Sequence, residues 1–259
     1  MSNFSPMFIR NVRLAAFGGA LFLIALVIGT PASVFRSAVF NAAPGVNFSS
    51  IEGTVWRPKI RGLTQGRHYI GDVQGQFKPS LLMRGAVGYD FTTTSSTLSA
   101  SVSAARGRSG LMLLDIRELV VGSALLERYA LAGVQVSGNV VVKDASVALK
   151  ASGRCESAVG DVQADILRAP AAHMGLPPID LVGELACRDG NLSLALSGVD
   201  EKAGRVSLNI AVLSGSRYQL AVDAELNDPA LRDLLYTFGF EQRGDSVVYE
   251  EIAALKMSS

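Results

Sequence analysis

The chain has 259 residues, of which 49% are hydrophobic and 18% charged, and its 24 basic and 23 acidic side chains leave a formal net charge of +1. A typical soluble domain carries about 25% charged residues, so this sequence is poor in charge. Proteins that bind nucleic acid present a strongly basic surface to the phosphates, and the near-neutral balance argues against such a partner. The length exceeds that of an average domain, but all-β architectures often use it as a single unit.

An apolar run lies near the N-terminus. Residues 14–35 begin with LAAFGGALFLIALVI and contain no charged residue. This window is long enough for the roughly 20 residues that a transmembrane helix needs. Arg10 and Arg13 precede it, and the chain has no acidic residue before Glu52. The positive-inside rule therefore places residues 1–13 in the cytoplasm and the main body on the other side of the membrane.

A cleavable signal peptide is the alternative interpretation of this run. Thr30 and Ala32 provide small residues at the spacing of a cleavage site, although Pro31 lies between them. The run is at the long end for a signal peptide, which favours a retained transmembrane helix. Both interpretations export the main body, for which we expect a linker over residues 36–48 and one β-rich domain over residues 49–259.

Cys155 and Cys187 are the two cysteines of the chain. An even number of cysteines in an exported domain favours a disulfide, because that compartment is oxidising. Such a bridge would contribute roughly 3 kcal/mol in the chain-entropy model. Two buried thiols are the alternative. The chain contains no C-x-x-C pair, so the cysteines do not resemble a metal or redox motif.

Alternation of apolar and polar residues dominates the exported part. Four segments show it most clearly: TLSASVSA (residues 97–104), NLSLALSG (191–198), RVSLNIAVL (205–213) and YQLAVDAEL (218–226). Successive side chains of a strand point to opposite faces of a sheet, so this pattern predicts half-buried antiparallel strands. The fold class that we expect is mainly β: a curved antiparallel sheet, sandwich-like, with a few short helices.

Turn residues separate these runs. Asp189-Gly190 suits a tight hairpin, because both central residues there need positive φ. Further turns are expected at Lys143-Asp144 and over Glu201–Gly204. Recurring turns every eight to twelve residues are typical of a meander.

Few helices are expected. The clearest lies in NDPALRDLLYTFGF, where Asp228 can cap the helix, Pro229 occupies its first position and Gly239 follows its last turn. A second short helix is expected over residues 123–133, and the segment over residues 160–170 suits a strand or a helix.

The sequence contains no recognisable active site. It has no G-x-S-x-G nucleophile motif, no phosphate loop and no dinucleotide fingerprint. His68 and His173 lack acidic or nucleophilic companions, so neither offers a mechanism of catalysis. We therefore expect a protein that is not an enzyme and that binds no cofactor or metal, with an envelope hydrolase as a remote alternative.

The stretch SSIEGTVWRP contains Trp56, the only tryptophan of the chain. Its position about twenty residues after a single membrane segment resembles the type II secretion system protein N family, in which a Gly-Thr-Val-Trp stretch opens the periplasmic part. The resemblance continues through RYALAGVQVSGNVVV, the two cysteine-containing segments and YQLAVDAELNDPALRDLLYTFGF, and covers most of residues 10–240. Here Arg57 and Pro58 follow the tryptophan, where the family often has a small residue and glycine.

This resemblance implies a non-enzymatic accessory component of type II secretion, held in the inner membrane of a Gram-negative cell with its β domain in the periplasm. The partners it implies are other inner-membrane secretion components, the outer-membrane secretin and, through residues 14–35, the lipid bilayer. The family also resembles membrane-anchored β proteins of the AsmA kind. That likeness implies an alternative function, a groove that binds or transfers lipid.

Trp56 and Arg57 are the candidate contact residues. Large aromatic side chains mostly serve cores, so packing is the favoured role of Trp56, and Arg57 can stack on it. Direct contact with a partner protein is the alternative.

Overall fold

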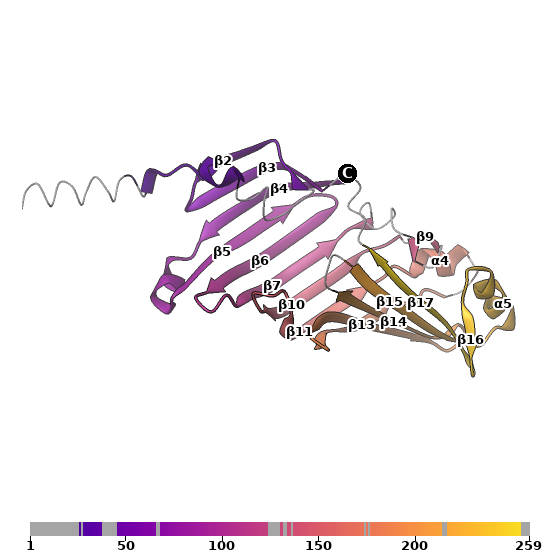
Figure 1. The fold of residues 1–259 in the computed structure, drawn as a ribbon. Coiled ribbons are helices and arrows are strands. Elements are labelled where there is room, and N and C mark those ends of the chain that lie inside the picture. Colours follow the sequence, from indigo (N-terminus) through magenta and orange to yellow (C-terminus); the bar gives the residue numbers. More distant parts are fainter. Residues whose placement is uncertain are drawn as a thin grey trace, which may run out of the picture.

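The computed structural model describes residues 26, 28–37, 46–65, 68–123, 130–131, 134–135, 137–173, 175, 177–213 and 217–254. Most of these residues form one antiparallel sheet of 15 strands, which runs the length of the molecule and curves as it does so (Figure 1). The predicted fold class, mainly β with few helices, is confirmed.

The strands follow one another across the sheet almost in chain order, because hairpins connect most neighbours. The order is β1-β3-β4-β5-β6-β7-β10-β11-β12-β13-β14-β15-β17-β16, and β2 pairs with β3. Their bounds are β1 Val46–Asn47, β2 Ser50–Thr54, β3 Arg57–Gln65, β4 His68–Phe77, β5 Ala86–Thr94, β6 Leu98–Gly107, β7 Met112–Val121, β10 Val140–Leu149, β11 Cys155–Ala164, β12 Leu181–Arg188, β13 Asn191–Asp200, β14 Gly204–Leu213, β15 Arg217–Leu226, β16 Glu241–Arg243 and β17 Ser246–Ala254. The short strands β8 (Ala130–Leu131) and β9 (Val134–Gln135) form a separate pair.

The sandwich-like arrangement that we expected is replaced by this single sheet. Among the described residues, each long strand is hydrogen-bonded to the next long strand, so the long strands form one continuous sheet and not two stacked sheets. Bulges allow a long sheet to bend, and the register shifts once in β6 between Ser101 and Val102 as it pairs with β7.

One predicted turn is wrong and two are confirmed. Lys143-Asp144 lies inside β10, where Asp144 has φ 47° and the register with β11 shifts. Aspartate tolerates this left-handed conformation, so the same residue type serves a bulge instead of a hairpin. Asp189 (φ 52°) and Gly190 (φ 77°) do turn the chain between β12 and β13. Residues 201–203 turn it between β13 and β14.

The predicted C-terminal helix is confirmed as α5 (Pro229–Thr237), followed by Gly239 with φ 86°. Its Leu235 packs with Ala224 and Phe240 at the end of the sheet. The segment over residues 160–170, which suited a strand or a helix, contains parts of both: β11 extends to Ala164, and the short helix α4 (Arg168–His173) follows. The helix expected over residues 123–133 lies largely outside the described residues, and two of its residues form β8.

Two 3-10 helices complete the described secondary structure: η1 (Ala32–Phe35) and η2 (Pro79–Arg84). Among the described residues, no helix is both long and apolar enough to cross a membrane. Residues 1–25, most of the expected transmembrane segment included, lie outside the described part of the chain. Strand β1 begins at Val46, within the range that we expected to be a linker.

Cross-strand partners divide the sheet into an apolar and a polar face. The row Leu185, Leu194, Ile210 and Leu220 follows the ladder across β12 to β15 on the apolar face. In β5 to β7, the row Phe91, Val102 and Ile116 continues the same face. Partners in an antiparallel ladder share a face, so the apolar face extends across the whole sheet.

The buried core covers only part of this face. Its buried members come from β10 to β15 and the connections beside them: Val142, Ala145, Val162, Ala164, Ile166, Ile179, Leu181, Leu196, Ala203, Leu208 and Leu220. Ile166 and Ile179 belong to the connection between β11 and β12, which packs on the end of the sheet. Across β3 to β6, the side chains of Ile60, Val73, Phe91 and Val102 are only half-buried.

Candidate functional site

The sheet divides at a seam between β11 and β12. The two strands pair only over residues 161–164 and 181–184, although each continues well beyond that ladder. At the far end of the seam, the Cys155 N–H donates to the carbonyl oxygen of Gly190 at 2.8 Å. Residues 156–160 of β11 and 185–188 of β12 therefore face each other across a gap in the backbone ladder.

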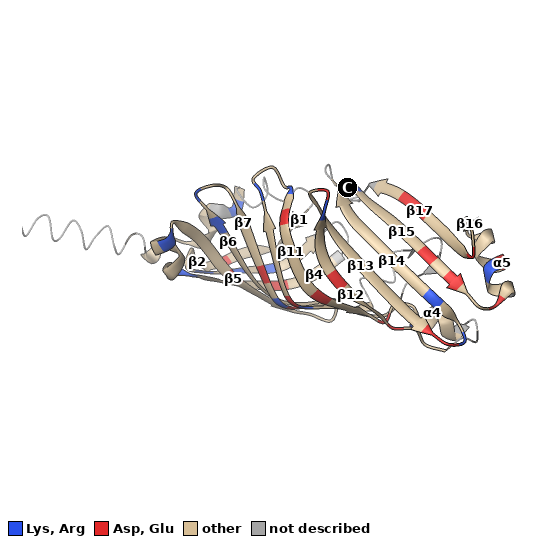
Figure 2. Ribbon diagram, turned by 90° about the horizontal axis from the view of Figure 1, so that it is seen from below, with Lys and Arg blue, Asp and Glu red and all other residues tan. Residues whose placement is uncertain are grey.

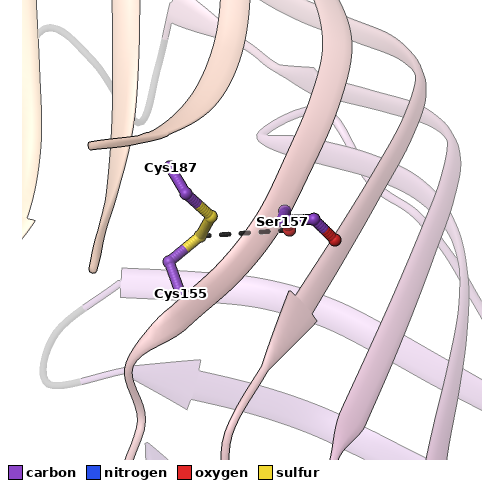
Figure 3. Close-up of a disulfide and its surroundings, with 3 residues drawn as sticks. All are labelled: Cys155, Ser157 and Cys187. Atoms are coloured by element: carbon purple, nitrogen blue, oxygen red, sulfur yellow. Dashed lines mark hydrogen bonds between the residues drawn. A yellow bond between two sulfur atoms is a disulfide. The ribbon is translucent and has the colours of Figure 1, made fainter. Parts of the chain in front are cut away.

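The predicted disulfide between Cys155 and Cys187 closes this seam (Figure 3). The two Cα atoms are 5.6 Å apart, and Cys155 is buried with 7% of its surface exposed. Its Sγ atom lies 4.0 Å from the carbonyl oxygen of Ser157. The bridge thus joins the two strands beyond the end of their ladder, beside the hydrogen bond between Cys155 and Gly190, which the spacing of the cysteines in the sequence did not reveal.

The two lateral edges of the sheet differ. At the N-terminal edge, the chain contacts itself at the end of β2: Pro31 forms a bridge with Thr54, and the Val55 N–H donates to the carbonyl oxygen of Thr30 at 3.0 Å. At the C-terminal edge, β16 pairs with β17 only over residues 246–248. The outer side of residues 249–254 has no partner strand among the described residues. An open edge of this kind offers backbone groups to an incoming strand.

Side chains along the open edge alternate between the two faces. Tyr249 and Glu251 share the apolar face with Val222 and Leu220, and the Tyr249 hydroxyl donates to Glu251 Oε2 at 3.0 Å. Burial and this neighbouring carboxylate raise the pKa of Tyr249, so its hydroxyl stays protonated and remains a donor. Ile252 points to the polar face and is 63% exposed.

Trp56 begins a row of aromatic rings at the opposite side of the sheet. Its ring meets Phe77 edge-on at a centroid distance of 4.9 Å, Phe77 meets Tyr89 at 5.3 Å, and Tyr89 stacks on Phe91 at 5.8 Å. The Tyr89 hydroxyl donates to the carbonyl oxygen of Val55 at 3.0 Å, and burial raises its pKa. Trp56 is thus half-buried in a packed row. Arg57 is exposed beside it, at the start of β3.

The polar face carries a charged network beneath η2. Lys78 Nζ lies 2.7 Å from Asp90 Oδ1 and donates to Ser103 Oγ at 3.0 Å, and the Ser103 hydroxyl donates to Asp90. Burial alone would raise the pKa of Asp90. The hydrogen bonds from Lys78 and Ser103 and the charges of Lys78 and Arg117 outweigh that effect, so the pKa of Asp90 is lowered.

No group of three or more His, Cys, Asp or Glu side chains within the described residues is arranged to hold a metal ion. His68 lies in β4 and His173 in α4, the short helix that follows β11.

The family model for type II secretion system (T2SS), protein N, matches residues 44–249. The chain belongs to this family. Membership implies an accessory component of type II secretion that interacts with other components of that system. Neither the curated proteins nor the solved structures contain a match to the chain.

Sequence reasoning found the cysteine pair and Trp56, and it missed the open edge of β17. The residues of β17 read SVVYEEIAA, in which adjacent valines and adjacent glutamates obscure the alternation of a strand. Its position beside β15 follows from the return of the chain after α5, which the local sequence does not encode.

Proposed function

We propose that this chain is a non-enzymatic accessory component of the type II secretion apparatus, held in the inner membrane by the uncharged run that begins at Leu14, up to the point before residue 30 where the chain packs on the sheet, with its sheet in the periplasm. The family match over residues 44–249, nearly the entire sheet, is the observation that carries this proposal. The uncharged N-terminal run and the flanking Arg10 and Arg13 support the orientation.

The mechanism that we propose is docking by strand addition. At the N-terminal edge of the sheet, residues 30–31 occupy the end of β2 at Thr54 and Val55, whereas residues 249–254 form an open stretch at the other edge. An extended segment of another secretion component, in the inner membrane or in the outer-membrane secretin, would pair with this edge. Backbone hydrogen bonds would provide affinity, and Ile252 would provide an apolar contact.

Secretion in a strain that lacks the chain tests this function. Expression of the full chain should restore export of type II substrates. The Ile252→Lys variant should restore less export, because a lysine on an edge strand opposes pairing with another strand. Val199→Lys is the matched control, since Val199 is 68% exposed but lies in β13, inside the sheet. Normal secretion without the chain would contradict the proposal. Equal rescue by both variants would contradict docking at β17.

The apolar face favours a second candidate function, the binding of a lipid or another apolar molecule. Across β3 to β6 this face carries the aromatic row from Trp56 to Phe91 and remains half-buried. Val102→Glu places a charge in its centre. Co-purification of lipid with the wild-type chain, lost in Val102→Glu, would support this function, and wild-type protein free of lipid would contradict it.

A further inference from the structure

The turns at the two ends of the strands carry opposite charge. Four neighbouring connections at one end, residues 53–60, 78–89, 104–114 and 147–155, contain no aspartate or glutamate. Their basic residues include Arg57, Arg84, Arg106, Arg108, Lys150 and Arg154. The registers of β2 to β11 place all four connections at the same end of the sheet.

Acidic residues prevail at the opposite strand ends. The connections over residues 165–180, 200–204 and 227–237 carry Asp165, Asp180, Asp200, Glu201, Asp228 and Asp233, against Arg168, Lys202 and Arg232. In Figure 2, blue segments recur at the turns along the upper edge of the sheet, and α4 lies at the lower edge, where red segments gather. A net charge of +1 for the chain therefore conceals a separation between the basic turns of β2 to β11 and the acidic connections that follow β11, which lie at the opposite strand ends.

The basic end also carries exposed apolar side chains. Met83 and Leu82 in η2 are 93% and 51% exposed, and Met112 at the start of β7 is 38% exposed. Arg106 is the cross-strand partner of Met112. A Cβ atom added to Gly85 would lie 3.4 Å from Arg108 Nε, so Arg108 lies beside the end of η2. We call Leu82, Met83, Arg84, Arg106, Arg108 and Met112 the basic rim.

Packing holds η2 in a defined conformation. The Lys78 N–H donates to the carbonyl oxygen of Gly88 at 2.9 Å, and the Lys78 side chain is paired with Asp90. Leu81 packs over Gly88, where an added Cβ would lie 2.5 Å from Leu81 Cδ1. Gly85 then ends η2 with φ 69°. Because Leu81 is directed toward the sheet, the two residues that follow it are directed toward solvent.

The basic rim lies at the end of the sheet where the N-terminal segment joins. Residues 30–31, near the end of the uncharged run, bond to Thr54 and Val55 at the β2–β3 turn. In the sheet, η2 connects β4 and β5, the two strands that follow β3. At the usual strand spacing, η2 therefore lies roughly 10 Å from the β2–β3 turn. A membrane that holds the part of the uncharged run before residue 30 would therefore lie beside the basic rim and away from the acidic end.

We propose that the basic rim rests on the bilayer surface, where its arginines bind anionic phospholipid headgroups and Leu82 and Met83 enter the interface. This inference rests on the proposed membrane insertion of the uncharged run that begins at Leu14. Arginine attracts anionic headgroups and apolar side chains are stabilised at the headgroup boundary, so the rim has the chemistry of an interfacial contact. The contact would fix the sheet against the membrane and direct its acidic end into the periplasm.

Depth-dependent quenching tests the contact. The described residues include no free cysteine, so Met83→Cys in the full chain accepts one polarity-sensitive fluorophore. The labelled chain is reconstituted into phosphatidylethanolamine vesicles with or without phosphatidylglycerol, and brominated lipids serve as quenchers. We expect a blue shift and quenching in the anionic vesicles. Val199→Cys, exposed near the acidic end, is the matched control and should show neither.

Charge reversal gives a second readout. Arg84→Glu with Arg108→Glu should abolish the blue shift at position 83, because each arginine contact changes partition to an anionic surface by roughly fivefold. Lys202→Glu with Arg232→Glu, at the other end, should leave it unchanged. Flotation of the vesicles on a density gradient shows whether the chain is bound to them. If the chain floats with the vesicles while the fluorophore at position 83 stays in water, the rim contact alone is overturned. A chain that does not float would overturn both the contact and the membrane anchor.

Discussion

At the scale of single residues, Trp56 connects the family motif to the packing of the sheet. Replacing it with alanine removes an edge-on contact with Phe77 at 4.9 Å and exposes one end of the aromatic row. We expect Trp56→Ala to lower the free energy of unfolding by about 2 kcal/mol, less than for a fully buried tryptophan. Urea denaturation measures the change. Unaltered stability together with lost secretion would show that Trp56 serves a partner and not the sheet.

Gly183 is required by the close approach of two strands. A Cβ atom at this position in β12 would lie 1.8 Å from the carbonyl oxygen of Ala195 in the neighbouring strand. Because that atom is backbone, relief requires the strands to separate, and we expect Gly183→Ala to cost more than about 2 kcal/mol. Gly107→Ala is the control, since its nearest contact would be 3.8 Å away. Equal thermal midpoints for the two variants would contradict this explanation.

Asp90 makes the stability depend on pH. Its pKa is lowered in the folded protein, so its carboxylate stabilises the fold above the unfolded pKa of about 4 and loses that effect as the pH falls through the folded pKa. Asp90→Asn should therefore reduce the free energy of unfolding at pH 7 by about 1 kcal/mol. The difference from wild type should vanish in strong acid. A difference that is independent of pH in urea titrations would exclude this carboxylate as the source.

At the scale of elements, the seam between β11 and β12 has the shortest ladder between two long strands of the sheet. The ladder there covers only residues 161–164 and 181–184, and the bridge between Cys155 and Cys187 closes a loop with a sequence separation of 32. Removing both cysteines as Cys155→Ala with Cys187→Ala should lower the free energy of unfolding by about 3–4 kcal/mol in the chain-entropy model. Denaturation of oxidised and reduced wild-type protein provides a second comparison. Coincident denaturation curves of the oxidised and reduced protein would mean that the disulfide does not stabilise the seam.

Strands were predictable where one face is buried and the other is solvated, as in residues 191–198 and 205–213. Hairpins were predictable where positive φ requires particular residues, as at Asp189-Gly190. Asp144 was misassigned because a bulge and a turn use the same left-handed conformation. Neither the seam nor the position of β17 was predictable, since both depend on pairing between residues that are distant in sequence.

At the scale of the whole molecule, the sheet has three distinct boundaries. At one edge residues 30–31 contact the end of β2, the other edge is open along β17, and the strand ends differ in charge. The charge difference collects residues from several turns, so it does not belong to one motif. The three boundaries are compatible with a sheet that is fixed at one side and available for docking at the other.

The central claim is that the open edge of β17 docks on other secretion components. In-cell photo-crosslinking at Ile252, with Val199 as the equally exposed control, tests it most directly. We expect adducts to secretion proteins from position 252 and none from position 199. Adducts to lipid alone, or protein adducts from both positions alike, would contradict the claim.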